Sequence, residues 1–276
     1  MRISLGQLIQ ITSAFGQVQS SLSWFVDSYS QLAVWKASVD RLLTFNHALE
    51  EAKLAAARPD GIAAFADPAG LVVDDLNLDR PDGRPIVSGA SFAIRSGEAL
   101  LVTGSSGAGK STLFRGIAGI WPYGTGRVGL PRDARILFLP QKPYIPIASL
   151  RDAVSYPATP GTFDDEATRA ALRDCRLQGF VDRLDEIANW SMTMSVGEQQ
   201  RLAVARALLH RPEWLFLDEA TSALDEKLER ELYELLRARL PESSLISIAH
   251  RPAVAGYHTR RLEVATDGTA SRLIVA

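Results

Sequence analysis

The stretch GSSGAGKST, Gly104–Thr112, restricts the fold of this chain more than any other feature of its sequence. It lies between an apolar run, EALLVT, and a helical run, LFRGIAG, so it has the spacing G-x-x-x-x-G-K-[ST] in a strand–loop–helix setting. Glycines at these positions let backbone N–H groups converge on a phosphate, and the N-terminus of the following helix adds a favourable field. The sequence therefore predicts a phosphate-binding loop within an α/β domain.

The side chains of this loop indicate a nucleotide with a magnesium ion. The Lys110 ammonium can reach the β- and γ-phosphates, and the Ser111 hydroxyl can ligate Mg²⁺. A glycine-rich turn without a ligand is the structural alternative, but the flanking strand and helix favour the phosphate loop. The predicted nucleotide contacts here are Gly104, Ser105, Ser106, Gly107, Ala108, Gly109, Lys110, Ser111 and Thr112.

A second element, WLFLDEA, is an apolar run that ends in two carboxylates. Asp218 stands at the end of the predicted strand, where it can hold Mg²⁺ or its waters, and Glu219 can polarise an attacking water as a general base. Alone, such a pair is more typical of a helix N-cap. Downstream of a phosphate loop, it predicts a metal-binding and a catalytic carboxylate.

Two further polar residues follow apolar runs, Gln141 after ILFLP and His250 after SLISIA. Parallel α/β sheets bind ligands at the carboxyl edge of their strands. At that edge the Gln141 amide can contact Mg²⁺ and the attacking water, and the His250 imidazole can hydrogen-bond the γ-phosphate. The predicted catalytic residues are Lys110, Gln141, Glu219 and His250, and the predicted magnesium ligands are Ser111, Gln141 and Asp218.

The stretch SVGEQQRLAVARALL, Ser195–Leu209, predicts a second anion-binding element. Ser195 opens a run with the apolar spacing of a helix, and the free N–H groups and positive dipole end of a helix N-terminus favour an anion. Lys110 and Ser195 lie 85 positions apart, so one chain carries two elements of this kind.

Composition excludes several other classes of function. The 30 Lys and Arg residues are balanced by 32 Asp and Glu residues, so we expect no nucleic-acid partner. A single cysteine excludes an internal disulfide and a cysteine-rich zinc site. Residues without a setting at a strand end receive no chemical role: Trp121 is interpreted as a packing residue, and His47, His210 and His258 as surface residues.

The N-terminal region contrasts with this composition, because residues 3–26 carry no charged side chain. As a helix this run would span about 36 Å, enough for a bilayer core. Its four glutamines and five serines need partners in hydrocarbon, which a bundle of helices could supply; an amphipathic soluble helix is the alternative. A helical pattern continues to Ala57, and residues 58–70 have the Pro and Gly content of a linker before a domain over 71–276.

The motifs GSSGAGKST, LPQKP, SVGEQQR, LFLDEATSALDE and SIAHR, in this order, resemble those of the ATP-binding cassette (ABC) ATPases over roughly residues 72–274. The resemblance implies an α/β P-loop NTPase fold with a parallel core sheet, a small antiparallel β subdomain and an inserted helical lobe over about 146–209. Here a long N-terminal helix would precede that fold. ATP and Mg²⁺ are the implied cofactors, and SVGEQ is similar to the family's signature motif.

In ABC ATPases two cassettes associate head to tail, so the signature motif of one subunit contacts the nucleotide on the phosphate loop of the other. By this resemblance, Ser195, Gly197 and Gln199 are expected to contact ATP bound by Lys110 of a second cassette, identical or different. The stretch SALD, Ser222–Asp225, resembles the D-loop at the dimer seam, and Gln141 belongs to a Q-loop that senses the membrane domain.

The stretches GIWPYGTGRVGLP and FLPQKPYIPIASLRDAVSYP resemble the half-transporter branch that includes peroxisomal acyl-CoA transporters and bacterial cobalamin and antimicrobial-peptide transporters. This implies that residues 1–57 are the end of a transmembrane domain, with its last membrane helix and cytoplasmic extension. The expected function is ATP hydrolysis coupled to transport across the cell (inner) membrane, with the ATPase domain on the cytoplasmic side and transmembrane helices as partners. A soluble, non-transport ABC ATPase and a truncated, non-functional fragment are the alternatives.

One position departs from the family pattern. Many ABC cassettes stack adenine on an aromatic residue shortly before the strand that leads to the phosphate loop, and the nearest equivalent here is Arg80. A guanidinium can stack on a base, whereas an exposed turn arginine is the alternative. ATP as the nucleotide is therefore expected from the resemblance.

Overall fold

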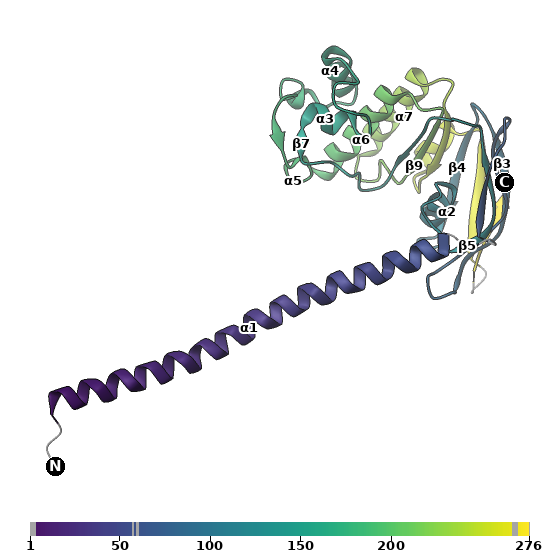
Figure 1. Ribbon diagram of the computed structural model, residues 1–276. Coiled ribbons are helices and arrows are strands. Elements are labelled where there is room, and N and C mark those ends of the chain that lie inside the picture. The colour runs from purple at the N-terminus through teal and green to yellow at the C-terminus, as the bar shows by residue number, and fades with distance from the viewer. Residues whose placement is uncertain (1–3, 57, 59–60, 267–269, 276) are drawn as a thin grey trace. The chain divides into compact units, whose positions relative to one another are not determined.

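The computed structural model describes residues 4–56, 58, 61–266 and 270–275. By internal contacts the chain divides into two compact units, residues 1–57 and 58–276. The first unit contains one helix, and the second contains the sheet and the remaining helices (Figure 1).

Helix α1 (Leu5–Ala56) is a single helix of 52 residues. Its apolar side chains lie on all sides of the helix rather than along one face, and large ones such as Phe15, Trp24 and Trp35 are more than half exposed. A helix with apolar residues all round is typical of a helix that packs against other helices. Among the described residues, no helix is both long enough and apolar enough to cross a membrane.

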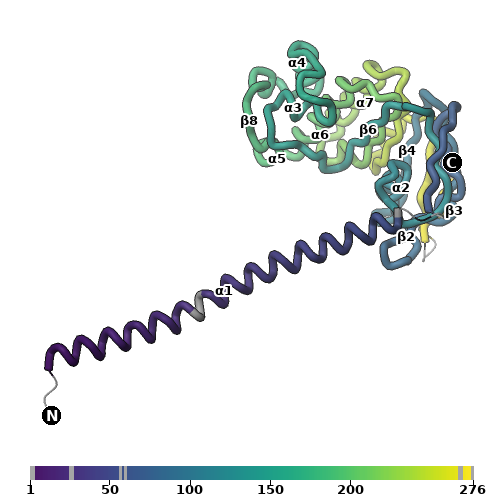
Figure 2. The backbone as a smooth tube through the Cα atoms, viewed as in Figure 1, coloured from purple at the N-terminus to yellow at the C-terminus, as the bar shows by residue number. Residues whose placement is uncertain are grey.

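The described residues of the second unit form a ten-stranded sheet in the order β1-β5-β2-β3-β12-β11-β4-β10-β9-β6. Its strands are β1 (Ile62–Ala66), β2 (Gly70–Asp79), β3 (Pro85–Arg95), β4 (Ala99–Gly104), β5 (Gly124–Leu130), β6 (Ile136–Leu139), β9 (Trp214–Asp218), β10 (Ser244–Ile248), β11 (Arg260–Thr266) and β12 (Ser271–Val275). Figure 2 shows this sheet curling around α2 (Lys110–Ile117).

The strands β11, β4, β10, β9 and β6 run parallel and form the predicted core sheet. Successive residues of β9 alternate between two buried clusters: Trp214 and Phe216 pack with α2, and Leu215 and Leu217 pack with the helices on the other face. Burial on both faces explains why these strands are continuous apolar runs in the sequence. Since parallel strands share one carboxyl edge, Gly104, Asp218 and the residues after β6 and β10 meet at that edge.

Strands β2, β3 and β5 pair antiparallel and form the predicted β subdomain, which joins the core sheet through β12. The end of the chain is the predicted hairpin, with β11 antiparallel to β12. Its turn at Asp267 and Gly268 lies outside the described residues.

The predicted linker 58–70 is a linker over only part of its length, because β1 lies inside it and pairs in parallel with β5. The Phe65 ring covers Gly129 so closely that a Cβ there would lie 2.5 Å from it, and the Arg127 guanidinium lies 4.8 Å from the ring centroid. Strand β1 forms by pairing with a strand far along the chain, so no local sequence pattern predicts it. The Pro and Gly content of the same stretch indicated a linker instead.

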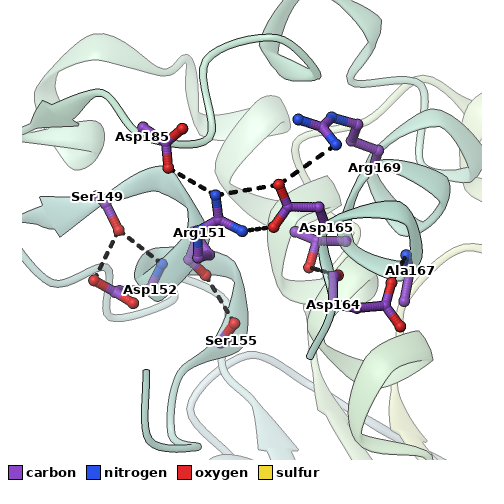
Figure 3. Close-up of polar contacts among 10 residues, drawn as sticks. Ser149, Arg151, Asp152, Ser155, Asp164, Asp165, Ala167, Arg169 and Asp185 are labelled. Carbon is purple, nitrogen blue, oxygen red and sulfur yellow. Dashed lines mark hydrogen bonds and ion pairs between the residues drawn. The ribbon is translucent and has the colours of Figure 1, made fainter. Parts of the chain in front are cut away.

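The helical lobe contains α3 (Leu150–Ser155), α4 (Asp165–Asp174), α5 (Trp190–Thr193), α6 (Val196–His210), the short helix η1 (Gln178–Phe180) and the strand pair β7 (Ala148–Ser149) and β8 (Ile187–Ala188). Figure 3 shows the ion pairs that hold it together. The Arg151 guanidinium of α3 contacts Asp165 of α4 and lies 2.7 Å from Asp185, which precedes β8. One half-buried cation therefore ties three segments of the lobe.

Helix α7 (Glu226–Arg239) and the short helix η2 (Pro252–Tyr257) complete the domain. The interpretation of His258, which directly follows η2, as a surface residue is wrong. Its Nδ1–H donates to Val254 O (2.9 Å), and its Nε2 accepts from the Ser247 hydroxyl (2.8 Å). Burial lowers the pKa of His258 to about 4, so the ring is neutral near pH 7. His258 therefore holds β10 at Ser247, the residue before the last of the strand.

Candidate nucleotide site

The phosphate loop joins β4 to α2, as the sequence predicts. Gly107 and Gly109 have φ angles of 78° and 87°, in the left-handed region where glycine is favoured. At Gly109 a Cβ would also lie 2.6 Å from Cγ2 of Ile86, so a side chain would not fit. The loop therefore requires glycine for both its backbone conformation and its packing.

Lys110 is the first residue of α2, directly after this loop, and is only 5% exposed. Its Nζ donates to Gly104 O (3.0 Å) and Ser105 O (2.8 Å). Burial lowers the pKa of Lys110, while the charges of Glu219 and Asp218 act to raise it. An ammonium held in a partly dry loop interacts strongly with a phosphate anion. Ala108, by contrast, is buried in the core, so only its backbone can serve the loop.

Ser111 and Asp218 meet as predicted, since the Ser111 hydroxyl donates to Asp218 Oδ1 at 2.8 Å. Burial raises the pKa of Asp218, and the hydrogen bond from Ser111 acts to lower it. A hydroxyl and a carboxylate side by side are oxygen donors that suit Mg²⁺, which in nucleotide sites takes few protein ligands and completes its shell with phosphate and water. Among the described residues, no group of three or more His, Cys, Asp or Glu side chains is arranged to hold a metal ion.

Glu219 lies between Gln141 and His250. Its Oε2 accepts from Gln141 Nε2 (3.2 Å), and its Oε1 lies 2.9 Å from His250 Nε2. Glu219 has a φ of 50°, which turns the chain directly after β9, and its N–H donates to Ile248 O of β10. Gln141, Glu219 and His250 follow three different strands, and the side chains of Gln141 and His250 hold the Glu219 carboxylate in place.

A cavity of about 800 Å³ extends from the phosphate loop. It is lined by loop residues, by Gln141 and Glu219, and by Ile86, Trp121 and the β2–β3 turn with Arg80. The Trp121 indole is fixed by its N–H, which donates to Asp79 O at 2.9 Å. The sequence interpretation of Trp121 as a packing residue is therefore incomplete: the side chain both packs and forms the wall of this cavity.

The second anion-binding element is the N-terminus of α6, and its residues do not line this cavity. Ser195 is the N-cap: its hydroxyl accepts from Glu198 N (3.3 Å) and donates to Glu198 Oε2 (2.7 Å). Burial would raise the pKa of Glu198, but hydrogen bonds from Ser195 lower it overall. Ser195 is exposed and Gly197 half-exposed, so a second molecule can reach this end of α6.

Gln199, predicted to contact nucleotide, points inward instead. It is 5% exposed, and its Nε2 donates to Ser191 O and Met194 O, both at 2.9 Å. The amide thus holds the turn before α6, and the polar side chain beside Ser195 is Glu198. The assignment of Gln199 as a nucleotide contact is therefore corrected, because the side chain lies on the buried face of α6.

The strand–loop–helix unit at the carboxyl edge of a parallel sheet defines this chain as a protein with the phosphate-loop nucleotide fold. Residues 87–222 match the family model described as ABC transporter. The chain therefore contains an ATP-binding domain of the ABC transporter family.

Relatives support this assignment. An uncharacterized ABC transporter ATP-binding protein of Synechocystis is 36% identical over 96% of this chain and 42% of its own length. The inner membrane ABC transporter ATP-binding protein YddA of Escherichia coli is 34% identical over 92% of this chain and 43% of its own length. ABC transporter D family member 1 of Arabidopsis is 35% identical over 70% of this chain and 15% of its own length. The chain spans less than half the length of these relatives.

A solved structure described as a bacterial Atm1-family ABC exporter with ATP bound has the same fold. Its TM-score is 0.64 and its identity 24%, over 78% of this chain and 40% of that protein. The predicted half-transporter branch agrees with the D family relatives.

Proposed function

We propose that this chain binds and hydrolyses ATP with Mg²⁺. The observation that carries the proposal is the position of Glu219, which directly follows β9 and lines the same cavity as the phosphate loop. Lys110, for the β- and γ-phosphates, and Ser111, for the metal, line the same cavity. Asp218, the second candidate metal ligand, accepts a hydrogen bond from Ser111.

Each residue of the site would have its own role in ATP hydrolysis. Glu219 would accept a proton from the attacking water, while Gln141 and His250 hold its carboxylate oriented. Bound through Ser111, Asp218 and Gln141, Mg²⁺ would neutralise phosphate charge. His250 would donate a hydrogen bond to the γ-phosphate, and Lys110 would offset the charge that develops on it.

The base would occupy the part of the cavity that Trp121 and Arg80 line. The Trp121 indole supplies an aromatic ring to the lining and its N–H is already bonded to Asp79 O. Stacking on such a surface accepts any base, because every base has a π face. We propose that Trp121 takes the part that an aromatic residue at position 80 would otherwise have.

Two substitutions in the full chain test whether one nucleotide spans this cavity. Trp121→Ala is expected to weaken ATP binding by about tenfold, from the loss of one stacking contact, and to leave inorganic tripolyphosphate binding within about twofold. Lys110→Ala is expected to weaken both ligands. Titration calorimetry measures the affinities of the parent chain and both variants for the two ligands, and equal losses of ATP and tripolyphosphate affinity in Trp121→Ala would contradict the base position.

The N-terminus of α6 would serve a second cassette. Ser195 and Gly197 are accessible at a positive helix end but lie outside the cavity of their own chain. We propose that they contact ATP held by Lys110 of a partner cassette, so that two chains form two composite sites. This arrangement gives each of the two phosphate-binding elements a use.

We further propose that hydrolysis drives transport across the bacterial inner membrane, with the ATPase domain on the cytoplasmic side. The name of the E. coli relative refers to that membrane, and alignment with the Synechocystis protein over 96% of this chain takes in α1. In this proposal α1 packs against transmembrane helices, which would cover its exposed apolar side chains and pair its amides. A soluble ABC ATPase without transport is the second candidate.

The solubility of the chain with and without detergent distinguishes a membrane transporter from a soluble ABC ATPase. The full chain is expected to aggregate without detergent, and a chain starting at residue 58 is expected to stay in solution, because the apolar residues exposed on α1 are removed with it. Light scattering with and without detergent measures both proteins. A full chain that stays monodisperse in plain buffer would favour the soluble ATPase.

A further inference from the structure

Gln200 is a buried polar residue for which the proposed chemistry has no role. It lies near the start of α6 and is only 1% exposed. A buried amide has to satisfy its donors and acceptor inside the protein, and its partners therefore show what it holds. None of these partners lies within α6.

The Gln200 amide bonds to two separate loops. Its Nε2 donates to the backbone oxygen of Gln141 (3.0 Å) and to the Ser222 hydroxyl (3.3 Å). Its Oε1 accepts from the backbone N–H of Ala223 (3.0 Å). One side chain thus joins α6 to the segment after β6 and to the segment after β9.

Both of these segments hold Glu219. The Gln141 side chain donates to Glu219 Oε2 at 3.2 Å, and the Ser222 N–H donates to Glu219 O at 3.1 Å. Gly197 lies against the second segment, because a Cβ there would come within 3.2 Å of Leu224 Cδ2. A displacement of the N-terminal turn of α6 would therefore move the two segments that contact Glu219.

We propose that Gln200 is a positioning residue that transmits the placement of the α6 N-terminus to Gln141 and Glu219 of the same chain. The inference rests on the proposed ATPase function and adds a link between two sites to it. When Ser195 and Gly197 engage a partner's nucleotide, Gln200 sets the geometry of the catalytic carboxylate in its own chain. Hydrolysis at one composite site then depends on occupancy of the other.

Gln200→Met tests the link, since methionine has a similar length but cannot make these hydrogen bonds. We expect kcat of the full chain to fall by about tenfold, because small displacements of a catalytic group are costly. Binding of ATP to the single chain is expected to stay within about twofold, because none of the three bonds reaches the phosphate loop. Thr168→Val is the matched control: it removes the hydrogen bond of another buried side chain, to the O of Asp164, the N-cap of α4, and should leave kcat unchanged.

A double-substitution cycle identifies the route. If Gln200 acts through Gln141, Gln200→Met should reduce kcat by no more than about twofold in a Gln141→Ala background. Gln200→Glu, which keeps the length and the acceptor but loses the donor, should reproduce the loss if the methionine variant does not fold. Reductions that multiply, or a kcat equal to that of the parent chain, would overturn the inference. A parent chain that releases no phosphate would instead overturn the proposed function.

Discussion

Glu219→Gln is expected to reduce ATP turnover by at least about 100-fold, the usual size of a general-base contribution. Glutamine has the same shape and can still hydrogen-bond Gln141 and His250, but it cannot accept a proton from water. ATP binding should persist, since Lys110 and Ser111 are untouched. Phosphate release under saturating ATP and Mg²⁺ measures the effect.

Glu213→Gln is the matched control for this substitution. Glu213 directly precedes β9, whereas Glu219 follows it, and its side chain is half-exposed with Arg135 as its ion-pair partner at 3.4 Å. An exposed pair of this kind contributes little to stability, so turnover should be unchanged. Normal turnover in Glu219→Gln would refute the assignment of the base.

A mixture of two inactive variants should recover hydrolysis. Ser195→Arg places a bulky cation at the α6 N-terminus, where it blocks the partner's nucleotide, and Lys110→Ala removes the phosphate contact. Each variant alone is expected to be inactive. In a mixed dimer the intact Lys110 of one chain faces the intact Ser195 of the other, so one of the two sites is complete.

Random exchange of the two variants makes about half of the dimers mixed, so about one quarter of the wild-type sites are complete. The recovered turnover should lie below one quarter of the wild-type rate, because the second site of each mixed dimer stays empty and the link through Gln200 is not engaged. Titration of one variant into the other, followed by phosphate release, measures the recovery. If Lys110 and Ser195 instead served one nucleotide within one chain, no mixture would recover activity.

The parts of the site with local signatures were predictable. The phosphate loop, Ser111 with Asp218, and the position of Glu219 follow from short motifs because one strand and its adjoining loop determine them. The convergence of Gln141 and His250 also followed, since parallel strands end at a common edge. These residues are tens of positions apart, yet the fold class alone places them together.

The sequence could not show which role each of the neighbouring polar residues at the start of α6 has. Glu198, Gln199 and Gln200 are consecutive, but the helix turns them in three directions: toward Ser195, toward Met194 O and toward Gln141 O. Only the three-dimensional structure shows that Glu198 caps the helix, that Gln199 holds the turn before it and that Gln200 joins two loops. Strand β1 and the wall formed by Trp121 escaped prediction for the same reason, since distant β5 and the β2–β3 turn define them.

The mass of the Glu219→Gln chain, measured by light scattering in detergent at saturating ATP and Mg²⁺, tests the composite site most directly. Because this variant retains nucleotide between two phosphate-binding elements, the protein mass should double relative to the nucleotide-free sample and return when magnesium is chelated. A mass that stays that of one chain at high protein concentration would contradict the account.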